Sequence, residues 1–348
     1  MSTAQADLTT TVDPDLIAMM DAVFADQRAN QSPDAPVDLD RRLWSNLDEL
    51  GLVRLTGSEE AGGSGAGWPE AAALLTAAAR HAVRIPLAEH DLLGCWLLEA
   101  ADLPVDGAVR TACVLDADGT ANGVPWASTV DSIVAVWPSG GAYRIADLDA
   151  AAPSVRITPG ANMIGEARDA VAVDVTALTG DEVPSATVAE LRLKSALVRA
   201  IQVCAALDRV VELAVDHTTS RIQFGRPLAK FQAVQNLIAD AAAEAALARA
   251  ATEAALVAAV TGGWSAPRLE FLVAAARSCA GHATSVVVRN AHQALGAIGT
   301  TREHRLHQYT RPALAWRSEF GSVDYWDGQV ADAALRAGGT GLWSLITG

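Results

Sequence analysis

The chain has 348 residues, of which 51% are hydrophobic and 19% charged; this composition is that of a folded protein and excludes a disordered one. Its formal net charge of −15 excludes a general electrostatic attraction to nucleic acid or to an anionic membrane, so local positive groups must hold any anionic ligand. The length allows two or three packed units.

Residues 14 to about 105 are predicted to be helical. Apolar side chains recur at helical spacing in residues 16–23 and again in residues 38–52, where Gly51 suits a helix C-terminus. Residues 69–82 predict an Ala/Leu-rich helix and residues 92–101 a short buried one. The Gly-rich segment between the helices, residues 59–65, lacks the pattern of a phosphate-binding loop and is predicted to be a turn.

From about residue 108 to residue 180 the apolar runs become shorter. The runs at 112–115, 132–137, 142–146 and 171–175 are separated by Gly, Pro, Asp and Ser, which is typical of a small all-β unit.

Helical periodicity returns at Ser185 and continues to Arg221. A very Ala-rich helix is predicted at about 234–260, another at about 267–295, and a shorter helix or turn at about 305–316. The sequence therefore predicts a mainly α protein with a small β domain. It has an N-terminal helical domain (1–107), a shortened middle β-domain (108–182) and a C-terminal helical bundle of about four elements (183–348).

The cysteines and the first 15 residues indicate the cellular compartment in which the protein is expected. The four cysteines are widely spaced without a C-x-x-C pair, which predicts buried thiols in a reducing compartment rather than disulfides or a metal site. Residues 1–15 have no apolar signal core, and no uninterrupted apolar run approaches about 20 residues. We therefore expect a soluble, cytoplasmic protein that does not enter a membrane.

The junction between the first two C-terminal helices is the most informative stretch of the sequence. Two arginines, a Gly/Pro turn and several glutamines lie within residues 221–235. Cations and amides concentrated at a helix junction suit an anionic, diphosphate-bearing ligand. An alternative interpretation is that Arg221 only interacts with a helix C-terminus while Gln232 and Gln235 form a solvated face.

Four motifs in this order resemble the acyl-CoA dehydrogenase family, across nearly the whole chain. The first is the N-terminal stretch from Trp44 to Glu70, which includes Gly62, Gly63 and Gly65. The second is a Trp-x-Ser turn with Trp126 and Ser128. The third is the flavin signature, with Arg221, Gln223, Phe224, Gly225, Pro227, Gln232 and Gln235. The fourth is a Gln-x-x-Gly loop with Gln293, Gly296 and Gly299, followed by Thr301 and Glu303.

The resemblance implies an acyl-CoA dehydrogenase-like fold, FAD as cofactor and an acyl-CoA substrate. In the family the diphosphate of FAD lies at a subunit interface, so Arg221 would donate to it from one chain and Gln232 and Gln235 would contact the adenine half. Phe224 would cover the adenosine or the interface, and Gly296 and Gly299 would let backbone N–H groups approach phosphate or ribose. Gln293 of the same loop would also bind the cofactor. Trp126 and Ser128 would lie against the isoalloxazine ring; Trp126 alternatively is an aromatic residue of the β core.

The sequence departs from the family where the catalytic base is expected. The family has a glutamate at one of two places, and here these match Phe320 and Ser195. Glu319 is one position away and is the only weak candidate for the base. One glycine of the Gln-x-x-Gly loop is also replaced, by Ala297.

These departures resemble the shorter, degenerate subunit of bacterial heteromeric acyl-CoA dehydrogenases, including those that act on steroid side chains. The first hypothesis is therefore a subunit of a heterotetramer whose longer, homologous partner supplies the base. The alternatives are a self-sufficient homo-oligomer using Glu319, and a non-catalytic scaffold subunit of the same fold. His304 and His307 are too few for a metal site, so no metal is expected.

Overall fold

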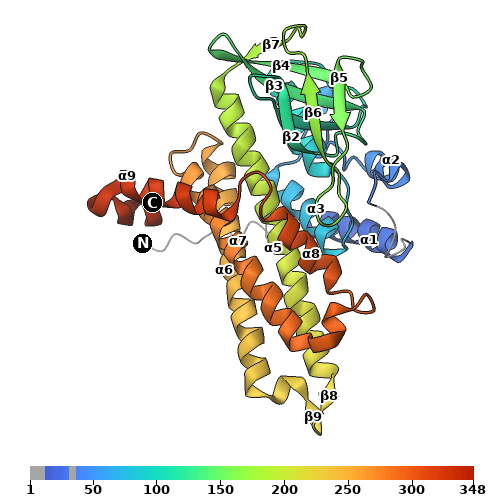
Figure 1. Cartoon of the computed structure of the whole chain (residues 1–348), viewed down its shortest axis with the longest axis vertical. Helices are drawn as coiled ribbons and strands as arrows, with labels where there is room; N and C mark the ends of the chain where they lie inside the picture. The colour runs from blue at the N-terminus through green and yellow to red at the C-terminus, as the bar shows by residue number, and fades with distance from the viewer. Residues whose placement is uncertain (1–11, 31–36) are drawn as a thin grey trace. The chain divides into compact units, whose positions relative to one another are not determined.

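The structure is a computed structural model that describes residues 12–30 and 37–348. These residues separate into two compact units (Figure 1). The N-terminal unit comprises Val12–Ala78 and Val83–Ser195, and the C-terminal unit comprises Ala79–Ala82 and Ala196–Gly348. The predicted division at 107 and 182 into three domains stays a prediction, and the expectation for residues 1–15 falls largely outside the described residues.

The helical part of the N-terminal unit begins with α1 (Pro14–Asn30) and α2 (Arg41–Glu49). Asp40 caps α2 by accepting from the backbone N–H groups of Arg42 and Leu43. Gly51, with φ of 70°, ends the same helix as predicted: its N–H donates to Asp48 O, and the N–H of Leu52 donates to Leu47 O. The 3₁₀ turn η2 (Glu59–Ala61) and α3 (Trp68–Arg80) follow.

A π-helix replaces part of the predicted helix at 92–101. The π-helix η3 (Ala88–Cys95) is buried along its whole length and continues into the short α4 (Trp96–Ala100). Such segments are rare and occur frequently at functional sites. Sequence periodicity at 3.6 residues per turn does not reveal the wider turn, so the prediction identified a helix but not its type.

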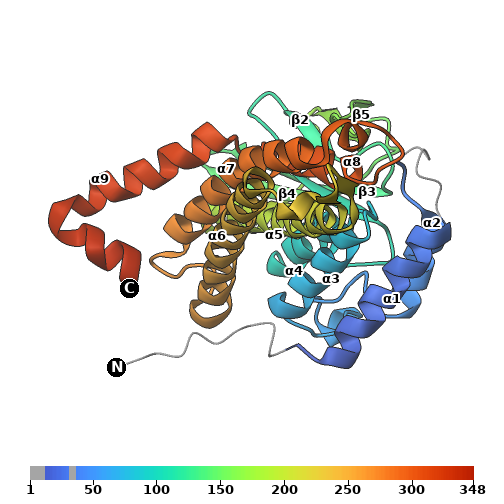
Figure 2. The same cartoon turned by 90° about the horizontal axis from the view of Figure 1, so that it is seen from below.

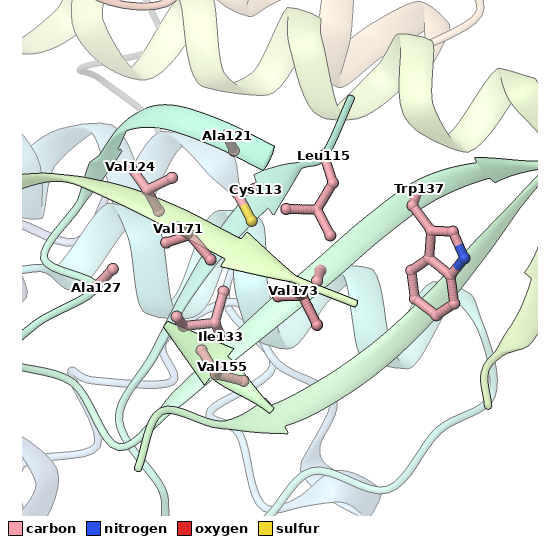
Figure 3. Packing of buried hydrophobic residues seen from close by; sticks show 11 residues of the cluster. Cys113, Leu115, Ala121, Val124, Ala127, Ile133, Trp137, Val155, Val171 and Val173 are labelled. Carbon is pink, nitrogen blue, oxygen red and sulfur yellow. The ribbon is translucent and has the colours of Figure 1, made fainter. Parts of the chain in front are cut away.

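Two small sheets form the β part of this unit, as predicted. One has the order β1 (Arg110–Val114), β3 (Ser132–Ser139), β4 (Ala142–Asp149), β7 (Asp181–Val183). The other has the order β2 (Thr120–Pro125), β6 (Arg168–Val173), β5 (Val155–Thr158). Strand β3 lies between β1 and β4, which explains its uninterrupted buried run from Ile133 to Trp137. Side chains of both sheets meet in one apolar core (Figure 3).

The C-terminal unit contains long helices that are rich in alanine. It begins within α5 (Ser185–Ser220), which the boundary at residue 195 divides, and continues with α6 (Gln232–Gly262) and α7 (Leu269–Leu295). Helices α6 and α7 pack along each other (Figure 2). The buried side of α6 is lined by small residues three or four positions apart, which lets the two backbones approach closely: Ala241, Ala245, Ala248, Thr252, Ala255 and Ala259.

The remaining elements are the 3₁₀ turn η5 (Gly296–Thr300), α8 (His307–Trp316) and α9 (Val323–Thr347). Helix α9 packs on α7 at its beginning: a Cβ at Gly281 would lie 2.6 Å from Val323, and Asp327 accepts from Ser278. It then extends beyond the bundle and bends back at Gly338, whose φ is 64° (Figure 2). No helix was predicted after residue 316.

Two helices have the length and composition that a membrane span needs: Gln232–Gly262 and the segment Leu269–Thr300. Their most apolar windows are 33% and 50% buried, and the core helices of a bundle meet the same criterion. The expectation that the chain does not enter a membrane stays a prediction.

Candidate functional site

A short β-hairpin connects α5 to α6 and carries the predicted flavin signature. Strands β8 (Ile222–Gln223) and β9 (Arg226–Pro227) pair in antiparallel register. Phe224 and Gly225 form the turn with φ of 53° and 78°, the two positive values that a type I′ turn requires. The side chain of Phe224 is 88% exposed. The hairpin therefore presents the signature at a protruding tip.

Cationic and aromatic groups of the hairpin contact each other. The Arg226 guanidinium lies 4.1 Å from the ring centroid of Phe231, and the rings of Phe224 and Phe231 meet edge to face at 6.0 Å. Arg221 lies at the end of α5, and its backbone carbonyl accepts from the N–H of Leu228 at 2.9 Å. Its side chain is exposed, and within the described residues no carboxylate pairs with it.

The two predicted adenine contacts lie in the first turn of α6. Gln232 donates to Asn236 Oδ1 at 3.1 Å, and Gln235 donates to the backbone carbonyl of Ala229 at 2.9 Å. Both side chains are exposed, as is Gln223. We call residues 221–235 the hairpin site: it combines an exposed guanidinium, amides, an aromatic face and the positive end of a helix.

The Gln-x-x-Gly loop forms η5 at the end of α7, in the same unit. Gln293 and Gly296 are exposed, and Gly296 has a φ of 66° with no atom within 4 Å of the place of a Cβ. Gly299 is buried, and a Cβ there would lie 2.9 Å from the Cβ of Leu295. Backbone conformation accounts for the glycine at 296, whereas packing within the chain accounts for the one at 299.

Histidines gather near this loop. The rings of His217 and His304 meet edge to face at 5.8 Å, and His307 Nδ1 lies 2.9 Å from the backbone oxygen of His304. Partial burial lowers the pKa of His217 and of His304, and neighbouring cationic groups lower both further. Within residues 12–30 and 37–348, no three potential metal ligands come together.

Trp126 and Ser128 belong to the N-terminal unit. Trp126 has a φ of 62° and is only 3% exposed, so its indole is buried. The backbone N–H of Ser128 donates to Asp169 Oδ2 at 2.7 Å, and Asp169 Oδ1 accepts from Gly160. The fully buried Asp169 thus positions the turn; sequence reasoning missed it because its partners lie on separate segments.

The loop after α8 contains the weak candidate for the base. Glu319 Oε2 forms an ion pair with Arg199 Nε at 2.7 Å, and its side chain is 14% exposed. Phe320 has a φ of 53°, and Arg277 donates to the backbone carbonyls of Arg317 and Glu319. At the other expected position, the buried Ser195 donates its hydroxyl to the carbonyl of Leu191 at 2.8 Å. A carboxylate paired with a buried guanidinium is a poor proton acceptor, since the pairing favours its charged form.

A buried lysine beside Ser195 was not predicted to be special. The Lys194 Nζ lies 3.6 Å from the ring centroid of Trp96 and 5.7 Å from that of Trp68, and pairs with Glu190 at 3.1 Å. Burial lowers the pKa of Lys194 to about 8, against the raising effect of Glu190. The sequence showed a lysine next to the expected base position, but the aromatic box around it comes from elements distant in the sequence.

The π-helix carries three further buried ionisable groups: Glu89, His90 and Asp91. Burial lowers the pKa of His90 to about 3, and burial raises that of Asp91 to about 6. Asp91 Oδ2 accepts from the N–H and the hydroxyl of Thr56, both at 3.0 Å, while Oδ1 is buried without a hydrogen-bond partner among the described residues. His90 is therefore neutral near neutral pH, and Asp91 keeps its proton to a higher pH than an exposed aspartate does.

Comparison with known proteins connects this geometry to a family. Residues 188–335 match the acyl-CoA dehydrogenase C-terminal domain. Acyl-CoA dehydrogenase IpdE2 of Mycobacterium tuberculosis is 28% identical over 79% of this chain and 80% of its own length. IpdE2 of Mycolicibacterium smegmatis is 26% identical over 85% of this chain and 89% of its own length.

Solved structures show the same fold. The ChsE4–ChsE5 complex from M. tuberculosis contains a chain that superposes with a TM-score of 0.78 and 19% identity, covering 97% of this chain and 98% of that one. Butyryl-CoA dehydrogenase of Megasphaera elsdenii superposes with a TM-score of 0.77 and 16% identity, and the match covers 97% of this chain and 100% of that one. The protein therefore has the acyl-CoA dehydrogenase fold, as expected. Its C-terminal part thus matches the acyl-CoA dehydrogenase C-terminal domain, and the relatives to which the whole chain is similar are acyl-CoA dehydrogenases.

Proposed function

We propose that this chain is one subunit of a heteromeric acyl-CoA dehydrogenase that forms an α,β double bond in a CoA thioester. In this proposal a longer, related chain supplies the general base. The observation that carries the proposal is the ion pair of Glu319 with Arg199, because it occupies the carboxylate nearest to an expected base position. Phe320 has no proton-accepting atom, and the Ser195 hydroxyl donates to a backbone carbonyl.

The hairpin site fits FAD in its chemistry. Its exposed guanidinium, Arg221, suits a diphosphate, and Gln232 and Gln235 carry amides that suit an adenine. FAD would supply the acceptor for the hydride that leaves the β-carbon of the thioester. The exposure of Phe224 and Arg221 fits a cofactor shared with another chain, whose surface would complete the enclosure.

Two solved relatives support the heteromer and the substrate class. One is the ChsE4–ChsE5 complex, and the other is the steroid acyl-CoA dehydrogenase Tcur3481–Tcur3483, which superposes with a TM-score of 0.78 and 19% identity. We extend this to a steroid side-chain CoA thioester as the substrate class and to a heterotetramer in the cytoplasm as the assembly.

A non-catalytic scaffold subunit is the second candidate. Buried Trp126 and the filled Trp68–Trp96 box around Lys194 favour it, because both are packed within this chain rather than open to a ligand. The self-sufficient enzyme with Glu319 as base has less support, since that carboxylate is already paired.

The test is to express the chain alone and together with a longer acyl-CoA dehydrogenase from the same genome, and to measure FAD content and dye reduction by acyl-CoA. Losing a positioned base costs about 10²–10⁴-fold in rate, so we expect the chain alone to be near background and the complex to be active.

Glu319→Gln in the complex should leave turnover within about twofold, with Glu303→Gln on the exposed loop as the matched control. Loss of turnover in Glu319→Gln alone, with assembly and FAD intact, would establish the self-sufficient mechanism instead. An active complex that loads FAD only on the partner's own residues would establish the scaffold.

A further inference from the structure

A pair of histidines lies where the end of α5 meets the loop that follows η5, within the C-terminal unit. His217 is in the last turn of α5, and the N–H of Arg221 donates to its backbone carbonyl at 2.9 Å. Positions four apart on a helical turn share one face. The His304 ring from the loop meets the His217 ring edge to face at 5.8 Å. The pair is therefore adjacent to the arginine with which the hairpin site begins.

Positive groups surround this pair without a carboxylate to balance them. Arg221 at the end of α5 acts on His217. Arg305 in the loop, His307 at the start of α8 and His217 itself act on His304. Across residues 12–30 and 37–348, no carboxylate forms an ion pair with any of these three histidines. In a chain of net charge −15, such a region suits an anionic ligand.

The two rings of the pair differ in their hydrogen bonds. His304 Nδ1 accepts from the backbone N–H of Leu306 at 3.1 Å, so this nitrogen carries no hydrogen and the ring is neutral. Protonation of Nδ1 would break that bond. The ring nitrogens of His217 have no hydrogen-bond partner in the part of the chain that the structure describes. Of the two, His217 is therefore the ring that can take up a proton without losing a hydrogen bond.

The charge of His217 depends on what is bound near Arg221. Partial burial, and then the positive charge of Arg221, lower the pKa of His217, so this ring is largely neutral at pH 7 in the free chain. An anion beside Arg221 has the opposite effect, since it offsets the guanidinium and attracts a proton. The effect acts through the electric field over the width of one helical turn, so the two side chains need no common hydrogen-bond acceptor.

We propose that His217 is a further ligand-binding residue of the hairpin site, which takes up a proton when a diphosphate-bearing ligand binds at Arg221. The inference rests on the proposed function only in taking FAD as that ligand. By linkage, a ligand that brings a proton to His217 must bind more tightly as the pH falls. For a doubly charged diphosphate within about 10 Å of the imidazole in water, the gain is about three- to tenfold at low ionic strength.

The first test is calorimetry with FAD, whose diphosphate does not itself titrate near neutral pH. FAD is added to the flavin-free chain, alone and with its longer partner, at pH 7 in PIPES and in Tris, which differ in ionisation enthalpy. We expect uptake of a fraction of a proton, decreasing to zero at pH 8.5. The affinity should be about three- to tenfold higher at pH 6 than at pH 8.5. FAD binding without proton uptake would overturn the inference, and this outcome requires no variant.

Variants identify the residue that takes up the proton. In His217→Gln, and in His217→Tyr, which keeps an aromatic ring against His304, uptake should vanish and the affinity should no longer depend on pH. His304→Gln should retain the uptake, because Nδ1 of His304 already accepts a hydrogen bond. His282→Gln is the control: it removes an exposed histidine of the same unit that pairs with Asp327.

The outcomes separate this inference from the proposed function. Uptake that persists in the folded His217 variants, or that vanishes only in His304→Gln, would overturn the role of His217 while FAD binding, and with it the proposed function, remains intact. Failure of FAD to bind either the chain or the complex would overturn both.

Discussion

At the residue scale, the guanidinium of Arg221 is available to a ligand, whereas the carboxylate of Glu319 is not available to remove a proton. Arg221 ends α5 with its charge available to a ligand, whereas Glu319 is held by Arg199 at 2.7 Å. A group that binds an anion must keep its hydrogen-bond donors free, and a general base must keep its lone pairs free. By this criterion the chain retains residues that suit cofactor binding but no carboxylate placed to remove a proton at either expected position.

Replacing Arg221 tests the hairpin site directly. In Arg221→Ala we expect flavin retention in the purified complex to weaken by about 1.5–3 kcal/mol, the range for hydrogen bonds to charged groups. Arg226→Ala removes the same charge from the same hairpin, but this guanidinium stacks on Phe231, so its effect on FAD occupancy should be smaller. Equal occupancy in Arg221→Ala and the unchanged complex would mean that the hairpin does not hold the flavin.

Asp91 provides a test of buried charge in the N-terminal unit. Its pKa is raised from 3.8 to about 6, so between these pH values the folded chain keeps a proton that the unfolded chain has lost. The free energy of unfolding therefore decreases as pH rises through this window, by about 3 kcal/mol at most. Asp91→Asn keeps an acceptor for Thr56 and should be more stable than the unchanged chain at pH 7 but not at pH 4.

Urea unfolding between pH 4 and pH 7 measures this difference. Asp48→Asn, on the exposed side of α2, removes the same charge at the surface and should show no such crossover. If the free energy of unfolding of Asp91→Asn changes with pH in parallel with that of the unchanged chain, burial does not raise the pKa of Asp91 as we expect.

At the element scale, the turn η5 and the hairpin depend on backbone conformations with positive φ. Gly296 has a φ of 66° with open space at its Cβ position, so its requirement is conformational and not steric. We expect Gly296→Ala and Gly296→Asn each to destabilise the chain by about 1–3 kcal/mol, since the ψ of −142° places the residue in a region that only glycine adopts readily. Thermal unfolding measures both. An unchanged midpoint in Gly296→Ala would show that the turn relaxes and that the backbone conformation does not decide this position.

Periodicity predicted most helices of the chain but missed two features. The π-helix at 88–95 has apolar and ionisable residues side by side because all of its sides are buried, so no face distinguishes it in the sequence. Helix α9 contains Gly338, Gly339 and Gly341, which indicate a loop by composition. Its beginning is instead stabilised by contact with α7, where Gly281 makes room for Val323 and Ser278 donates to Asp327.

At the scale of the whole molecule, the C-terminal unit exposes more apolar surface than a bundle needs. Leu247 on α6 and Leu335 and Trp343 on α9 are 55%, 79% and 73% exposed. Exposed fractions this high for leucine and tryptophan leave apolar surface that a partner chain could cover. We expect an obligate oligomer, with itself or with the longer partner, and light scattering at micromolar concentration measures it. A stable monomer that retains flavin would contradict both the oligomer and the shared cofactor site.

The sequence by itself predicted the resemblance to acyl-CoA dehydrogenases, the order of helical and β segments and the candidate residues of the hairpin site, because these predictions depend on local periodicity, turn chemistry and ordered motifs. Only the tertiary structure showed that Arg199 pairs with Glu319, that Trp68 and Trp96 enclose Lys194, that Asp169 positions the Ser128 turn and that Arg277 is buried with unpartnered donors. Each of these joins segments that lie far apart in the sequence. Burial and pairing set the charge state and availability of such side chains, and both arise from packing that local sequence patterns do not encode.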